Sequence, residues 1–211
     1  MENFVWIIAL VFVPVLLLVL LQDFSDSPAA KGAAGEAAVR SRLSDELDGG
    51  TYILFHDLII PSQNGTTQID HVCISPYGIF VLETKNYTGW IFGGEKQAHW
   101  TQTIYKEKHR FQNPLRQNYA HIKALAALLK LPESVFHSVV VFTGDCELKT
   151  EMPPNVCRLH QAVGYIRSFQ AALLSEHAVG TAAALLSDSR YRCDSEKLSA
   201  HKEQLRHRHR R

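Results

Sequence analysis

Two carboxylates and a lysine stand inside two stretches that otherwise have the pattern of apolar strands. Asp70 interrupts QIDHVCI, and Glu83 and Lys85 interrupt IFVLETKN. Side chains alternate between the faces of a strand, so Glu83 and Lys85 share one face and lie about 7 Å apart. Residues 75–78, SPYG, are typical of a turn that folds the two strands together. We therefore expect Asp70 to lie beside Glu83 and Lys85.

These three residue types form a minimal set for phosphodiester hydrolysis. Carboxylate oxygens are hard ligands that can hold Mg²⁺ while leaving positions for water and a phosphate. The cation acidifies a bound water, and a lysine can orient that water or neutralise the developing charge. An ordinary ion pair on an exposed strand is the alternative, but burying such charges without a purpose is costly.

The composition is that of an ordinary globular protein. The chain has 211 residues, of which 46% are hydrophobic and 20% charged, and its formal net charge is +1. It therefore lacks the overall basic charge of many nucleic-acid binders, although a local basic surface remains compatible with it. The four cysteines form no C-x-x-C pair and predict neither a zinc ribbon nor a disulfide framework.

Residues 4–21, FVWIIALVFVPVLLLVLL, contain no charged or polar side chain. A run of this length predicts a transmembrane helix. A cleaved signal peptide is the alternative, but the leader MEN has no Lys or Arg, and the run exceeds the usual apolar region of ~7–15 residues. Lys31, Arg40 and Arg42 follow the run. We therefore expect a single-pass membrane protein whose soluble part faces the cytoplasm.

The rest of the chain predicts a mixed α/β fold. Hydrophobic periodicity, glycines and prolines indicate a helix, three strands, one or two further short strands, a helix, a strand and a helix. We place these elements at 35–47, 52–61, 67–75, 79–86, within 87–104, and at 113–131, 134–144 and 159–175. Asn113 is the expected N-cap of the second helix, with Pro114 at its first position. The order predicts a mixed central sheet flanked by helices.

Four segments together resemble the NERD domain, the nuclease-related domain of the PD-(D/E)xK nuclease-like superfamily. They are GEAAV, TQIDHVCISPYGIFVLETKNYTGWIFG, Trp100 and NPLRQNYAHI, in this order. The resemblance implies a restriction-endonuclease-like fold with an αβββαβ core. We accordingly divide the chain into an anchor (1–22), a linker (23–34), a NERD nuclease-like domain (35–145) and a C-terminal helical extension with a basic tail (146–211).

The same resemblance implies roles for five residues. Asp70 and Glu83 resemble the metal-binding acids, and Lys85 resembles the catalytic lysine. Glu36 resembles the first-helix acid that completes the metal site, or else it is a helix-start glutamate favoured by the helix dipole. Gln117 matches a helix glutamine near the site, or else makes a structural hydrogen bond. The implied cofactor is Mg²⁺ or Mn²⁺.

Other residues have a structural and a functional interpretation. His71 should point to the strand face opposite Asp70, which favours a structural role. Trp90 and Trp100 could stack on bases, although core aromatic residues are commoner. Residues 206–211, RHRHRR, could contact phosphates or anionic lipid, or could form a solubilising tail.

The sequence thus predicts a membrane-anchored, metal-dependent nuclease that hydrolyses phosphodiester bonds, with DNA expected above RNA as the substrate. One alternative is a catalytically inactive nucleic-acid-binding module of nuclease fold held at the membrane. Another is a membrane interaction protein whose charged strand residues only serve folding.

Overall fold

The computed structural model describes residues 27–209. The predicted anchor at residues 4–21 therefore lies outside the described residues. Within the described part of the chain, no helix combines the length and apolar character needed to cross a membrane.

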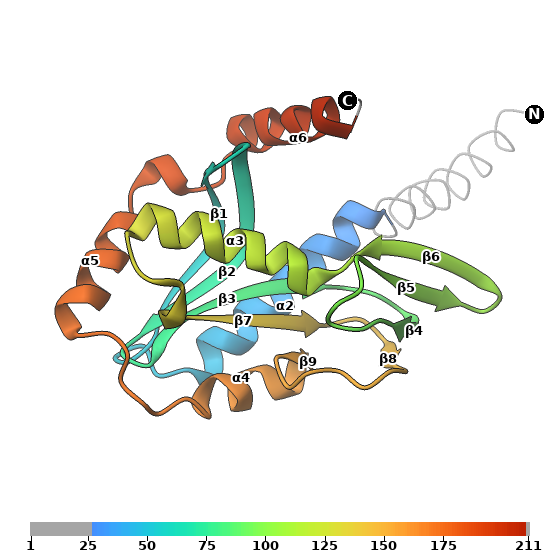
Figure 1. Ribbon diagram of the computed structural model, residues 1–211, viewed down its shortest axis with the longest axis horizontal. Coiled ribbons are helices and arrows are strands. Elements are labelled where there is room, and N and C mark those ends of the chain that lie inside the picture. Colours follow the sequence, from blue (N-terminus) through green and yellow to red (C-terminus); the bar gives the residue numbers. More distant parts are fainter. Residues whose placement is uncertain (1–26, 210–211) are drawn as a thin grey trace, which may run out of the picture.

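The main sheet has five strands in the order β1-β2-β3-β7-β9 (Figure 1). Neighbouring strands pair antiparallel from β1 to β3, whereas β3–β7 and β7–β9 are parallel. The predicted mixed sheet is therefore confirmed. The strands are β1 (Ile53–Ser62), β2 (Gly65–Ser75), β3 (Gly78–Lys85), β7 (Phe136–Phe142) and β9 (Val156–Arg158).

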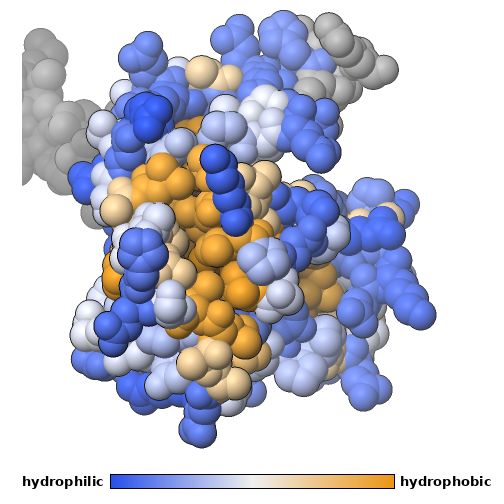
Figure 2. All heavy atoms as spheres, turned by 60° about the vertical axis from the view of Figure 1, so that its left-hand side comes forward, coloured by the Kyte–Doolittle hydropathy of each residue, from blue (hydrophilic) through white to orange (hydrophobic). Residues whose placement is uncertain are grey.

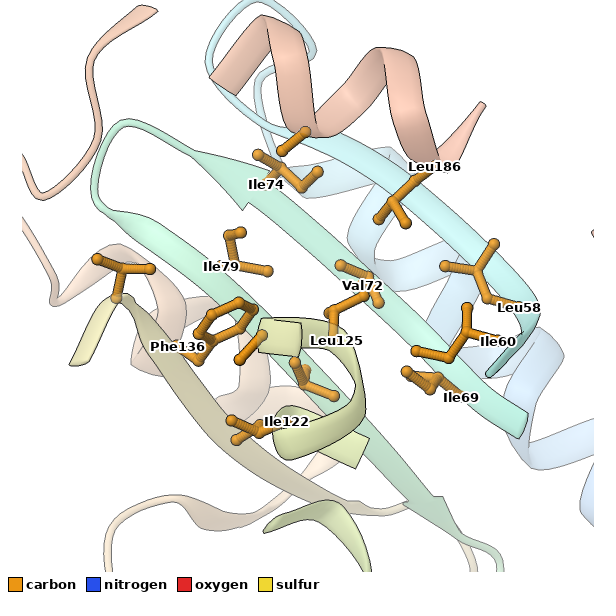
Figure 3. Close-up of a cluster of buried hydrophobic side chains, with 14 of the residues drawn as sticks. Leu58, Ile60, Ile69, Val72, Ile74, Ile79, Ile122, Leu125, Phe136 and Leu186 are labelled. Atoms are coloured by element: carbon orange, nitrogen blue, oxygen red, sulfur yellow. The ribbon is translucent and has the colours of Figure 1, made fainter. Parts of the chain in front are cut away.

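Helices cover both faces of this sheet. Helices α2 (Pro28–Glu46) and α4 (Leu159–Arg167) bury one face, through residues such as Leu43 and Ile166. Helices α3 (Pro114–Leu129) and α5 (Glu176–Leu186) bury the other face. Figure 3 shows Ile122 and Leu125 of α3 and Leu186 of α5 in one apolar cluster with isoleucines of the strands. Apolar side chains also reach the surface on the side that carries α5 (Figure 2).

A second, smaller sheet has the strand order β6-β5-β4-β8. Its inner face packs on the main sheet, where Ile91 and Trp100 contact Val140 and Phe142 of β7. Trp100 is fully buried, so its interpretation as a core residue is correct and it cannot stack on bases. The strands are β4 (Gly89–Phe92), β5 (His99–Ile104), β6 (Glu107–Gln112) and β8 (Cys146–Leu148).

The last helix lies against the hairpin that β1 and β2 form. Helix α6 (Ser195–His209) contacts the hairpin tip, where the backbone N–H of Thr66 donates to Gln204 Oε1 at 3.1 Å. Two short 3₁₀ helices, η1 (Glu133–Val135) and η2 (Ser189–Tyr191), complete the elements of the described residues.

Three boundaries differ from the sequence prediction. Residues 28–34, expected in a linker, form the first turns of α2, because Ser27 caps this alanine-rich segment by accepting from the Ala30 N–H at 3.1 Å and Pro28 begins it. The predicted helix 159–175 ends at Arg167, and α5 follows as a separate helix. Residues after 145 also supply β8 and β9, so they complete both sheets as well as adding helices.

The beginning of α3 is as predicted. Asn113 is its N-cap, and the side-chain oxygen accepts from the Leu115 N–H at 2.9 Å. The amide of Asn113 also donates to the carbonyl oxygens of Gly94, Glu95 and Gln97. This single buried side chain therefore joins the start of α3 to the loop between β4 and β5.

Two histidines pair inside the fold. His71 is fully buried, and its Nδ1 lies 2.8 Å from Nδ1 of His56 on the neighbouring strand. Burial, together with the neighbouring His56, lowers the pKa of His71 to about 3. The structural role expected for His71 therefore requires its neutral form.

We predict that the His56–His71 pair makes the protein acid-sensitive. Below pH 6.5 the unfolded chain takes up a proton at His71 that the folded chain does not, so stability falls as the pH decreases. Between pH 7.5 and pH 5 this difference should cost about 2 kcal/mol, which is the amount by which the pH-dependent change in stability of wild type should exceed that of a protein without His71. Urea unfolding at both pH values measures it. His71→Leu should lose less stability than wild type over this pH range. His160→Leu, a change at an exposed histidine of α4, is the control and should lose as much as wild type. Equal losses in all three proteins would contradict the prediction.

Candidate functional site

Asp70, Glu83 and Lys85 meet where β2 and β3 diverge. The pairing of the two strands ends with His71 opposite Leu82. Beyond this pair, the Oδ2 atom of Asp70 accepts a hydrogen bond from the backbone N–H of Thr84 at 2.8 Å. A side-chain oxygen of β2 thus takes the place that a backbone carbonyl oxygen would have in a regular strand pair. The predicted proximity of Asp70 to Glu83 and Lys85 follows from this arrangement.

In β1, the alternation of side chains between the two faces of the sheet shifts by one residue at Asp57, a change that we call the slip. Ile53 and Phe55 pack against the core under α3, and so do Leu58 and Ile60, which strict alternation would place on the opposite face. Asp57 has a φ of 53°, in the left-handed region that non-glycine residues seldom adopt.

Strand β2 slips at the residue directly opposite. Ile74 and Val72 pack on the face under α3, and strict alternation would continue this face with Asp70. The next residue that packs there is instead Ile69, one position out of step. The register of the two strands is the same before and after this step. Because both strands slip together, the pair of aspartates Asp57 and Asp70 is released from regular pairing.

Glu83 is the buried member of the site, with only 2% of its surface exposed. Its Oε1 accepts from Lys85 Nζ at 2.6 Å, and its Oε2 lies 3.2 Å from His121 Nε2. Burial alone would raise the pKa of Glu83, but the charge of Lys85 and the hydrogen bond of His121 outweigh it and hold the pKa below its usual range. Glu83 is therefore an ionised carboxylate.

Helix α3 supplies two residues to the site from successive turns. Gln117 Oε1 accepts from Lys85 Nζ at 3.1 Å, and His121, four residues later, reaches Glu83. His121 Nδ1 also lies 2.8 Å from Thr67 Oγ1 on β2. The structure brings Gln117, which the sequence resemblance selected, into contact with Lys85. Sequence reasoning missed His121, although the spacing of four residues on one helix was the available signal.

Helix α2 brings Glu36 to the same place, because Gly35 lets it approach the strand ends closely. A side chain at Gly35 would meet Thr143 Oγ1 at 2.7 Å and Asn86 Cβ at 2.8 Å. Burial and, next, the carboxylate of Asp57 raise the pKa of Glu36 to about 6. Asp57, which sequence reasoning also missed, forms an ion pair with Arg40.

Asp70 adds to this concentration of negative charge. Burial, followed by the charge of Glu83, raises the pKa of Asp70 well above its usual range. Raised pKa values at Glu36 and Asp70 mean that the site favours additional positive charge, which a proton or a cation can supply.

The oxygen donors fit a hard divalent cation by their chemistry. Within the part of the chain that the structure describes, however, no three His, Cys, Asp or Glu side chains form a ready set of ligands. Both oxygens of Glu83 are engaged, one by Lys85 and the other by His121. Glu36, Asp70 and Glu83 remain the carboxylates that could hold the cation.

A cleft of about 1550 Å³ opens beside these residues. Glu36, Asp70, Gln117 and His121 line one part of it. Residues 61–64 and 66–68 of the β1–β2 hairpin and residues of α6 line another part. The charged groups therefore border a space large enough for a sizeable substrate.

These features define a mixed α/β protein with a carboxylate- and lysine-containing site at a split between two strands. The family described as the nuclease-related domain matches residues 31–143, more than half of the chain. The chain therefore belongs to the nuclease-related domain family, as its sequence resemblance predicted.

A relative also matches part of the chain. An uncharacterized protein of Bacillus anthracis is 47% identical over 123 residues, a segment that covers 58% of this chain and 57% of that protein. No solved structure matches the chain.

We predict that the carboxylate of Glu36 opposes folding when no metal is present. Its pKa is about 6 in the folded chain against 4.5 ordinarily, so its destabilising effect grows as the pH rises through this window and persists above it. Glu36→Gln should therefore be more stable than wild type at pH 8 by on the order of 1 kcal/mol, after allowance for solvent screening. The two proteins should be equally stable near pH 4.

Thermal melting in EDTA at both pH values measures this difference. Glu95→Gln, a change at an exposed loop glutamate, serves as the control and should not stabilise the protein. Added Mg²⁺ or Mn²⁺ should raise the melting temperature of wild type more than that of Glu36→Gln. A Glu36→Gln protein that is less stable than wild type at pH 8 would contradict the prediction.

Proposed function

We propose that this protein is a metal-dependent nuclease that hydrolyses phosphodiester bonds in DNA, with a restriction-endonuclease-like core. The observation that carries the proposal is the convergence of Asp70, Glu83 and Lys85 at one strand split beside a large cleft. Membership of the nuclease-related domain family supports the same reaction class. The apolar run at residues 4–21 would hold the protein in a membrane, with its soluble part on the cytoplasmic side.

The proposed cofactor is Mg²⁺ or Mn²⁺, held by Asp70, Glu83 and Glu36. When bound, such a cation acidifies water and stabilises negative charge on a phosphate. Support comes from the oxygen chemistry of the three side chains and from the raised pKa values of Glu36 and Asp70, which burial and then neighbouring carboxylates cause and which a nearby cation would counteract.

Lys85 would act as a fixed positive charge. Burial alone would lower the pKa of Lys85, but the adjacent Glu83 carboxylate outweighs it and raises the pKa above its usual range. The amine is therefore protonated at neutral pH and is suited to stabilise charge that develops on the phosphate, rather than to take up a proton.

Gln117 and His121 would be positioning residues. Gln117 accepts a hydrogen bond from Lys85, and His121 contacts Glu83, so each restricts the orientation of one charged group. Both come from a single rigid helix, which can hold the site within the tolerance that catalysis requires.

A module that binds nucleic acid without cutting it is the second candidate. Two observations favour it: both Glu83 oxygens are engaged, by Lys85 and His121, and the described residues contain no ready set of ligands for a metal. In this case the charged groups would serve stability and electrostatics only.

We predict that Asp70→Asn and Lys85→Met each reduce metal-dependent cleavage by about 100-fold, the usual effect of removing one group that stabilises the transition state. The full chain, purified in detergent, is incubated with Mg²⁺, Mn²⁺ or EDTA and with plasmid DNA, single-stranded DNA and RNA. Lys202→Met, a change at an exposed lysine of α6, is the matched control and should cleave as wild type does.

The outcomes separate the two candidates. Cleavage that requires the metal and is lost in both site variants supports the nuclease. Cleavage that survives Asp70→Asn would refute the proposed site. If the folded wild type cuts none of the substrates but retards them in a gel, the binding module is the correct function.

A further inference from the structure

The small sheet has one face that does not pack on the main sheet. Its inner face carries Ile91 and Trp100, which are fully buried. Because strand side chains alternate, the opposite face carries Trp90 and Phe92 of β4 and every second residue of β5 and β6. We call this surface the outer face and define it by Trp90, Phe92, Lys108, Arg110, Gln112 and Lys149.

Two aromatic rings of the outer face are open to solvent. Trp90 is 49% exposed and Phe92 is 37% exposed. Three of the five large hydrophobic side chains that are exposed in the described residues belong to this small sheet, the third being Tyr105 in the turn between β5 and β6. Exposed aromatic residues gathered on one element are typical of an interaction site.

Cations follow the aromatic residues across the sheet in two rows. Trp90 pairs with Thr103, which pairs with Lys108. Phe92 pairs with Thr101, which pairs with Arg110 in the same way. With neighbouring strands about 4.8 Å apart, each cation lies about 10 Å from its aromatic residue, with only a threonine between them.

The outer face also carries one carboxylate, which is already paired. Glu147 accepts from Lys149, whose ammonium lies 4.7 Å from the centre of the Trp90 ring. Glu107, the acidic residue nearest Lys108 in the sequence, points to the inner face with His109. Lys108 and Arg110 are both exposed, so the positive charge of the outer face is available to an anion.

The outer face leads to the cleft described above. Gln112 stands on it after Lys108 and Arg110, again with a spacing of two residues. Gln112 also lines the cleft together with Glu36, Asp70 and Gln117. A chain that lies on the outer face can therefore continue directly to the candidate site.

We propose that the outer face binds single-stranded DNA and directs it into the cleft. Bases stack on Trp90 and Phe92, and phosphates contact Lys108 and Arg110. Open aromatic rings combined with a row of cations are suited to unpaired bases on a charged backbone, because every base has a π face and duplex DNA hides it. The inference rests on the proposed function for its substrate, but it concerns binding and can be tested without cleavage.

The test measures the affinity of the full chain in detergent and EDTA for a fluorescein-labelled 20-nucleotide single-stranded DNA of mixed sequence, by fluorescence anisotropy. Trp90→Ala should weaken binding by about 10-fold, the usual effect of losing one stacking platform. Arg110→Glu should weaken it by a similar factor and make the affinity less dependent on salt concentration. The matched controls are Leu173→Ala, which removes another exposed apolar side chain, and Arg192→Glu, which makes the same charge change beside β1; both should bind as wild type does.

Each result decides the proposal. Weakened binding in the two outer-face variants alone, with single-stranded DNA preferred to a duplex of the same sequence, supports it. Wild-type affinity in either variant, tighter binding of the duplex, or tighter binding of RNA of the same sequence would overturn it. If wild type cleaves DNA while Trp90→Ala and Arg110→Glu bind normally, the outer face is refuted as a binding surface and the proposed nuclease activity is unaffected. If DNA binds through the outer face but is not cleaved, the nuclease activity is refuted and the outer face is supported.

Discussion

The burial of the Glu83 carboxylate is the constraint around which the rest of the site is organised. An ionised group with almost no contact with water is tolerated only when its neighbours satisfy both oxygens. Lys85 on the same strand and His121 on α3 do so. Because His121 also contacts Thr67, this one carboxylate connects β3, α3 and the β1–β2 hairpin. The same contact with Glu83 keeps Lys85 protonated despite its burial, so the stability of the core and the electrostatics of the site have a common origin.

The second organising feature is the shared slip of β1 and β2. In regular strands, Asp70 would simply alternate with its neighbours, and the backbone of Thr84 would pair with another backbone group. The left-handed conformation of Asp57 and the loss of pairing at Asp70 free a carboxylate to approach Glu83. Unusual backbone conformations of this kind persist only where the surrounding structure supports them, and they are common at functional sites. Arg40 provides that support by pairing with Asp57.

The small sheet gives different roles to residues of the same type. Trp90 and Trp100 belong to neighbouring strands, yet one is half exposed and the other fully buried among Phe111 and Phe142. The buried tryptophan anchors the small sheet to β7, which lies beside the strand that carries Glu83. The outer face is therefore held in a fixed position relative to the candidate site. Residues after 145 take part in this attachment through β8 and β9, so they are integral to the fold.

The sequence by itself determined the order of the main elements, the cap of α3 and the proximity of Asp70, Glu83 and Lys85. These features depend on local rules: strand alternation, turn residues and capping act over a few positions of the chain. Only the tertiary structure showed that Asp57 and His121 belong to the site and that Trp90 and Trp100 face opposite ways. His121 and Glu83 are 38 residues apart, and Arg40 and Asp57 are 17 apart. Contacts at such separations depend on how whole elements pack against one another, which no local pattern of residues encodes.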